Sequence, residues 1–140
     1  MTASERAVEL TRAAAEAAAD KLAEEIIALD VSDQLVITDA FIVASADNDR
    51  QVRAVVDAIE EKLRGMGAKP VRREGLKEAR WVLLDFNDIV VHVQHVEDRQ
   101  FYALERLWKD CPVIELPEHV HRGRDGRDGR DGRPDDAASS

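Results

Sequence analysis

Residues 81–94, WVLLDFNDIVVHVQ, constrain the fold of this chain of 140 residues more than any other segment. Two β-branched and aromatic runs flank Asn87-Asp88, and both of these residue types tolerate the positive φ of a two-residue hairpin turn. That turn fixes the register of the two strands that it joins. The expected pairs are Phe86–Ile89, Asp85–Val90, Leu84–Val91, Leu83–His92, Val82–Val93 and Trp81–Gln94.

Alternation along the hairpin sorts its side chains onto two faces of a sheet. One face is wholly apolar and is expected to lie in the core: Val82, Leu84, Phe86, Ile89, Val91 and Val93. The other face, called the mixed face below, combines apolar and polar groups: Trp81, Leu83, Asp85, Val90, His92 and Gln94. A helix could cover the mixed face, but its buried polar groups would then all need partners. An interface with a partner protein or a second copy meets both needs, so the mixed face is the predicted interaction surface.

The first forty-five residues predict one helix and two short strands. Thr2 and Glu5 have the spacing of a capping box, which opens the helix. Apolar residues then recur at three- and four-residue steps as far as Leu29, so the helix is expected to reach that residue. Residues 35–38 and 41–45 are short β-branched and aromatic runs that predict two strands.

A second helix is predicted between Asp47-Asn-Asp49, which supplies its N-cap, and the glycines at 65 and 67. Its apolar stripe has the helical period: Val52, Val55, Val56, Ile59, Leu63 and Met66. Pro70 confines a short strand near Val71 to an edge or a start. A third helix is predicted from Asp98 to Pro112, and residues 113–116 are expected to be extended.

This order of elements predicts an α+β fold in two layers, with a mixed sheet of about five strands and helices mainly on one face. Residues 1–121 are expected to form the domain. Residues 122–140 repeat Arg, Gly and Asp and cannot bury apolar surface, so this tail is expected to be disordered.

The formal charge of −9 lies entirely on the predicted domain, because the tail holds five Arg and five Asp. Residues 1–121 carry 15 basic and 24 acidic side chains. Such a surface repels a phosphate backbone, whereas it steers encounter with a basic protein. One local basic excess, partly offset by Glu74 and Glu78, could reach RNA phosphates beside a docking site: Lys69, Arg72, Arg73, Lys77 and Arg80.

Cys111 is the only cysteine, which excludes a disulfide within the chain and fits a reducing compartment. It is expected to be a small buried apolar residue. The N-terminal residues lack the apolar core of a secretion signal, and no run of about 18 apolar residues could span a membrane. A cytoplasmic location is therefore expected.

Catalytic and metal-binding patterns are weak. Asp47 with Asp49, or Asp85 with Asp88, could hold magnesium in a nucleotidyltransferase, which is the alternative from another functional class. Such a site also needs a glycine loop that cradles phosphate, and the chain has none. We therefore expect no enzyme activity, no cofactor and no metal.

Several separate motifs resemble those of the ribosomal silencing factors, also called the Iojap-like family. The resemblance runs in order from about residue 5 to residue 116. The motifs are Arg50-Gln-Val-Arg-Ala-Val, Arg73-Glu-Gly75, Trp81-Val-Leu-Leu-Asp-Phe86, Val90-Val-His-Val93 and Arg99-Gln-Phe-Tyr-Ala-Leu-Glu-Arg-Leu-Trp108. Asn87 and Gln94 stand where the family pattern leads one to expect a glycine and an aromatic residue.

The resemblance implies a nucleotidyltransferase-like fold without the catalytic signature, and a translational repressor that acts by steric occlusion. Members bind the fourteenth protein of the large ribosomal subunit and block joining of the small subunit when nutrients are short. A role in ribosome assembly and a homodimeric form are also implied. The residues that the resemblance implies at the partner surface are Glu74, Trp81, Asp85, His92, Arg99, Tyr102 and Glu105, with Trp81 and Tyr102 as apolar anchors; an internal role in organising the face is the alternative for His92 and Arg99. Leu83 joins this predicted surface through its place on the mixed face.

Overall fold

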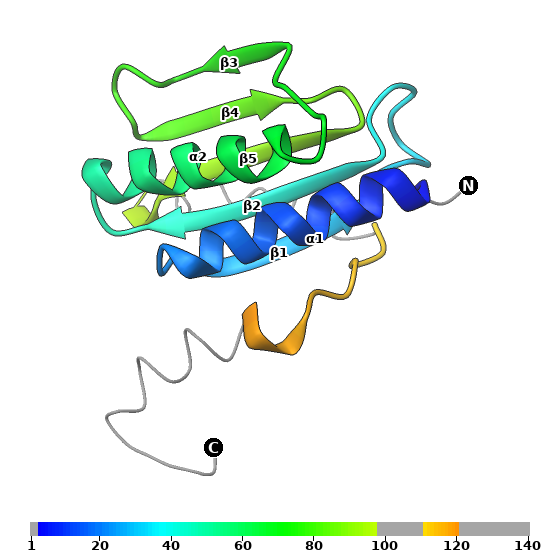
Figure 1. The fold of residues 1–140 in the computed structure, drawn as a ribbon, viewed down its shortest axis with the longest axis horizontal. Helices are drawn as coiled ribbons and strands as arrows, with labels where there is room; N and C mark the ends of the chain where they lie inside the picture. Colours follow the sequence, from blue (N-terminus) through cyan, green and yellow to red (C-terminus); the bar gives the residue numbers. More distant parts are fainter. Residues whose placement is uncertain (1–2, 98–110, 121–140) are drawn as a thin grey trace, which may run out of the picture.

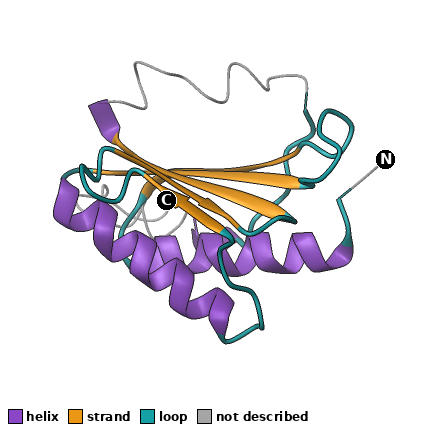
Figure 2. Cartoon of the chain, turned by 90° about the horizontal axis from the view of Figure 1, so that it is seen from above, coloured by secondary structure: helices purple, strands orange, loops and turns teal. Residues whose placement is uncertain are grey.

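The structure is a computed structural model that describes residues 3–97 and 111–120. In these residues five strands form one mixed sheet in the order β1-β2-β5-β4-β3, and two helices pack on one of its faces (Figures 1 and 2). The elements in chain order are α1 (Glu5–Asp20), β1 (Glu24–Asp30), β2 (Ala40–Ala46), α2 (Asp49–Arg64), β3 (Arg72–Glu74), β4 (Trp81–Asp85) and β5 (Ile89–His95). The predicted α+β class with a five-stranded sheet is confirmed.

The hairpin of β4 and β5 has the predicted register, from Asp85 opposite Val90 to Trp81 opposite Gln94. The turn is closed by a hydrogen bond of 2.9 Å from the Phe86 amide to the Ile89 carbonyl, and Asn87 adopts a φ of +74°. On its other side β5 pairs in parallel with β2, so β5 lies in the middle of the sheet. The apolar face of the hairpin is buried beneath the helices, as expected.

Helix α2 also agrees with the sequence. The Asn48 side chain caps it by accepting a hydrogen bond of 2.8 Å from the Gln51 amide. Its predicted stripe is buried against the sheet from Val52 to Leu63, and Met66 packs partly buried beside it. Strand β3 follows Pro70 at the edge of the sheet, where a proline is tolerated.

Helix α1 is shorter than predicted. Ser4, rather than Thr2, is its N-cap, and the helix ends at Asp20 instead of continuing to Leu29. Leu22 adopts a left-handed φ of +65°, and the Ala23 amide donates to the Ala18 carbonyl, which together close the last turn. Glycine is the residue that usually marks such an end, so a leucine at this position left the sequence without a stop signal.

The predicted strand at residues 35–38 is wrong, because these residues form a loop between β1 and β2. Val36 is fully exposed and Ile37 is 72 % exposed. Strand β2 already pairs with β1 on one edge and with β5 on the other, so no edge of it remains for a further strand. Strand propensity alone therefore does not decide the structure of this run.

The segment after residue 110 returns to the outer edge of β1. Val113 forms an isolated antiparallel bridge with Leu29, and the Ile114 amide donates to the Ala28 carbonyl at 2.9 Å. This confirms an extended segment at the start of residues 113–116. Cys111 is buried, as expected. The predicted third helix and the tail lie outside the described residues.

Candidate partner-binding surface

Figure 2 shows both helices on the same side of the sheet. The apolar face of the hairpin packs in the core with α1 and α2, so the mixed face lies on the other side. The parallel pairing of β2 with β5 adds residues that the hairpin alone could not reveal. Phe41 lies opposite Val90, Val43 opposite His92, and Ser45 opposite Gln94. Sequence reasoning missed these β2 residues, because the pairing joins strands far apart in the chain.

The side chains of the mixed face are more deeply buried on β5 than on β4. Trp81, Leu83 and Asp85 on β4 are half-buried, whereas His92 and Gln94 on β5 are buried. The difference follows from position, since β5 is central and β4 is separated from the sheet edge by only the three residues of β3. Among the described residues of the hairpin, the contacts that a partner can reach on this face therefore come from β4.

Trp81 is held by His92. The indole Nε1 donates a hydrogen bond of 3.0 Å to His92 Nδ1, and the two rings lie with centroids 6.0 Å apart. The Phe41 ring lies 5.1 Å from the imidazole. Because Nδ1 accepts, the neutral imidazole carries its proton on Nε2. His92 thus lies below the surface as a support for Trp81.

Burial lowers the pKa of His92 from 6.5 to about 4. The imidazole is therefore neutral at pH 7 in the folded protein.

This pKa predicts a pH-dependent stability. The unfolded chain binds a proton at His92 below about pH 6.5, whereas the folded chain does so only near pH 4, so stability is lost as the pH falls through that window. We expect this group to contribute a loss of about 2 kcal/mol in the free energy of unfolding between pH 7 and pH 5. Urea denaturation at both pH values should show that loss in the wild type but not in His92→Phe. Equal losses in the two proteins would contradict it.

Three polar atoms beside Trp81 are buried without a hydrogen-bond partner in the described part of the chain. They are His92 Nε2 and both the oxygen and the nitrogen of the Gln94 amide. Buried polar groups without partners lower the free energy of unfolding, so folding stability alone does not explain His92 and Gln94 at these positions.

The acidic residues at the β3 side of the surface share one arginine. Arg72 lies 3.7 Å from the Asp85 carboxylate and 3.4 Å from that of Glu74. The second Asp85 oxygen accepts a hydrogen bond of 2.9 Å from the Asn87 amide. Asp85 is thus engaged with its turn and with Arg72. In residues 3–97 and 111–120, no group of three or more His, Cys, Asp or Glu side chains is placed to hold a metal ion.

Gly75 brings the loop before β4 against the backbone of Trp81. It has a φ of +83°, and a Cβ at this position would overlap the Trp81 carbonyl oxygen. The Ala79 amide donates back to the Gly75 carbonyl at 2.9 Å, which closes the loop. Gly75 therefore allows the loop to pass close to the Trp81 backbone, where β4 begins.

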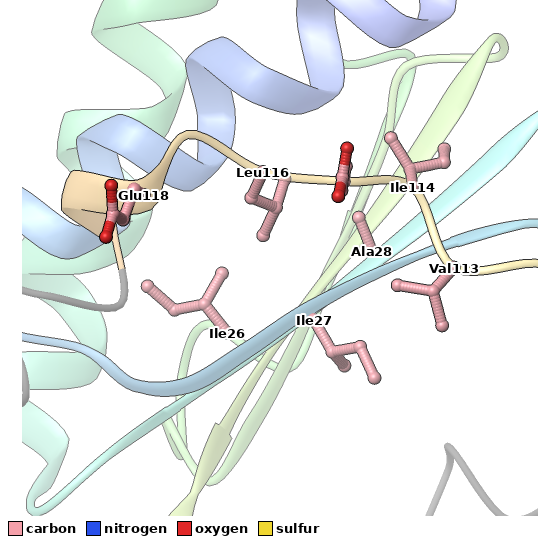
Figure 3. Close-up of a pocket in the computed structure, with 8 residues that line it drawn as sticks. Ile26, Ile27, Ala28, Val113, Ile114, Leu116 and Glu118 are labelled. Atoms are coloured by element: carbon pink, nitrogen blue, oxygen red, sulfur yellow. The ribbon is translucent and has the colours of Figure 1, made fainter.

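A groove of about 330 Å³ lies at the opposite edge of the sheet, between β1 and the segment after residue 112 (Figure 3). Its lining is mainly apolar: Ile26, Ile27, Ala28, Val113, Ile114, Glu115, Leu116 and Glu118. None of the residues that the sequence predicts at the partner surface lines this groove. Its only charged side chains are carboxylates, and it has no nucleophile paired with a base.

The predicted surface residues thus fall into three groups. Trp81, Leu83, Asp85 and Glu74 lie together on β3 and β4, and His92 lies beneath Trp81. Arg99, Tyr102 and Glu105 lie outside the described residues. No helix in the described ranges is both long and apolar enough to cross a membrane.

Comparison with known proteins identifies the family. The model of the family "Ribosomal silencing factor during starvation" matches residues 4–139. The ribosomal silencing factor of Bacillus subtilis is 40 % identical over 107 residues, which cover 76 % of this chain and 91 % of that protein. The chloroplastic protein Iojap of Zea mays is 36 % identical over 77 % of this chain and 47 % of its own length.

Solved structures agree with this match. A Chromobacterium violaceum crystal structure has 38 % sequence identity and a TM-score of 0.70, covering 72 % of this chain and 84 % of its own. A Bacillus halodurans crystal structure has 37 % identity and a TM-score of 0.68, covering 77 % of this chain and 98 % of its own. The family model, the sequence matches and the shared fold together show that this chain belongs to the family of ribosomal silencing factors.

Proposed function

We propose that this protein docks the β4 side of its mixed face on a basic protein of the large ribosomal subunit, the fourteenth, and so blocks joining of the small subunit. Membership of the family gives the general activity, which is non-catalytic binding to ribosomes and silencing of translation during starvation. The observation that carries the finer proposal is the half-buried Trp81, with the carboxylates of Glu74 and Asp85 farther along the same face of the sheet.

The chemistry of this surface suits a basic protein. An interface centre rich in tryptophan with polar groups at its rim is typical of protein partners. Leu83 adds apolar area next to Trp81 on the same strand face. The acidic excess of the chain favours encounter with a positively charged partner and disfavours RNA.

RNA contacts near Arg72, Arg73 and Lys77 are proposed as minor. Arg72 is shared by Glu74 and Asp85, and Arg73 pairs with Glu60 at 2.9 Å, so both guanidinium groups would have to leave carboxylates to reach a phosphate. Lys77 has no ion-pair partner in the described part of the chain. Of the three, Lys77 is therefore the residue best placed to touch RNA.

Replacing Trp81 with alanine tests the docking surface. We expect binding to the large subunit to weaken by about 2 kcal/mol, roughly 30-fold in Kd, because an aromatic anchor is lost. Co-sedimentation with separated large subunits measures the affinity, and re-mixing with small subunits measures joining. Val36→Ala, which truncates a fully exposed side chain outside the mixed face, is the matched control and should bind like the wild type.

The same experiment distinguishes the silencer from an assembly adaptor and tests whether the mixed face contacts the ribosome. A folded Trp81→Ala protein with unchanged affinity would remove this face from the interface. Binding to large subunits without inhibition of joining would show an assembly adaptor instead of a silencer. If the mixed face joins two copies of the chain, Trp81→Ala should change the oligomeric state measured by analytical ultracentrifugation.

A further inference from the structure

We infer that His92 is a positioning residue for docking: it holds the Trp81 indole in the orientation that meets the ribosomal partner. The inference rests on the proposed function, because it assumes that Trp81 is the anchor. His92 itself is only 5 % exposed, so it can act on a partner only through Trp81.

The register of the hairpin places Trp81 and His92 within contact distance of each other. Trp81 lies opposite Gln94, and His92 lies opposite Leu83, so Trp81 and His92 are diagonal neighbours on one face. Diagonal neighbours in a sheet are within reach of aromatic side chains. The indole extends across this diagonal and donates to His92 Nδ1 at 3.0 Å.

The imidazole itself has little freedom to turn away. Phe41 on the neighbouring strand β2 lies 5.1 Å from its ring centroid, and Trp81 lies 6.0 Å from it. Together with burial, these two rings fix the plane of the imidazole. Its low pKa keeps it neutral, which leaves Nδ1 free to accept a hydrogen bond at neutral pH.

A fixed indole favours binding because less freedom is lost when the partner arrives. Ordering a side chain at an interface has an entropic cost, and a side chain that is already ordered avoids much of it. The indole N–H also has its partner before docking, so the partner need not supply an acceptor. Loss of the acceptor should therefore weaken docking even though the Trp81 ring remains.

Two substitutions at one position isolate the acceptor. His92→Phe keeps a planar ring of similar size but removes the acceptor, whereas His92→Asn supplies an amide oxygen near the place of Nδ1. We expect His92→Phe to bind large subunits about 10-fold more weakly, mainly through faster dissociation, and His92→Asn to bind within about 3-fold of the wild type. His119→Asn, at an exposed position outside the mixed face, is the matched control. If His92→Phe does not fold, His92→Leu replaces it.

The indole N–H gives a readout that needs no ribosome. The chain has two tryptophans, so the Trp81 signal in a ¹H–¹⁵N spectrum is the one absent from Trp81→Ala. In His92→Phe this signal should shift upfield and its proton should exchange faster with solvent, while in His92→Asn it should stay close to its wild-type position. A purely structural role would lower the stability of both variants without this difference between them.

The outcomes distinguish the two proposals. If Trp81→Ala weakens binding but a folded His92→Phe or His92→Leu protein binds like the wild type, the role of His92 is overturned and the docking surface stands. An unchanged indole signal in His92→Phe would also overturn it. If Trp81→Ala itself binds normally, the docking surface fails, and the positioning role fails with it.

Discussion

Gly75→Ala is expected to lower the free energy of unfolding by about 4 kcal/mol, because the added methyl group meets both an unfavourable φ and a steric overlap. The φ of +83° costs an alanine roughly 1–2 kcal/mol. The added Cβ would also overlap the Trp81 carbonyl oxygen, so the backbone of the loop or of β4 must move, at a cost of about 1–3 kcal/mol. Urea denaturation followed by circular dichroism measures the change.

Gly67 provides the matched control for this substitution. It has nearly the same φ, +84°, but the nearest atom to an added Cβ is the end of the Arg6 side chain at 3.7 Å, an ordinary contact. Gly67→Ala should therefore cost only the conformational part, about 1–2 kcal/mol. If both substitutions cost the same, the close approach to Trp81 has no energetic consequence. Because the clash acts on the Trp81 backbone, Gly75→Ala should also weaken ribosome binding.

Leu84→Ala is expected to destabilise the fold by about 3 kcal/mol while leaving the docking surface chemically unchanged. Leu84 is fully buried on the helix-covered face of β4, and truncation of a buried leucine leaves a cavity as well as losing apolar contacts. Thermal and urea denaturation measure the loss. Under conditions where the variant is folded, its affinity for large subunits should match that of the wild type.

Leu83→Ala is the complementary substitution at the adjacent position. Leu83 points to the opposite face and is half-buried, so its truncation should cost about 1 kcal/mol of stability. Its affinity for large subunits should fall by several-fold, because apolar area next to Trp81 is lost from the interface. If folded Leu84→Ala protein binds large subunits more weakly than folded Leu83→Ala protein, the docking surface does not lie on the face of β4 that carries Leu83.

Elements with a strong local signal were predicted correctly from the sequence. The hairpin turn at Asn87-Asp88 fixes the register by itself, and the alternation of residues 81–94 then decides which side chains face the helices. Helix α2 has both a capping segment, Asp47-Asn-Asp49, of which Asn48 is the N-cap, and a complete apolar stripe. These features depend on residues close together in the chain, so they can be predicted without knowledge of the tertiary structure.

The errors arose where the local signal was ambiguous. Ile26 and Leu29 have helical spacing after α1, but in β1 Ile26 packs in the helix-side core and Leu29 in a separate cluster with Val31 and Cys111. Two apolar residues three apart fit either structure in a short run. Similarly, the β-branched Val36 and Ile37 favour a strand, yet both are exposed in a loop.

The sequence by itself determined the α+β class, the register of the hairpin, the caps and stripe of α2, and the family to which the chain belongs. It did so because each of these rests on turn chemistry, periodicity or motifs that are local. Only the tertiary structure decided that β1 occupies the edge beside β2, that β2 adds Phe41 to the mixed face, and that His92 lies buried beneath Trp81. These features follow from strand order and burial, because contacts between strands distant in the chain leave no periodic pattern in the sequence.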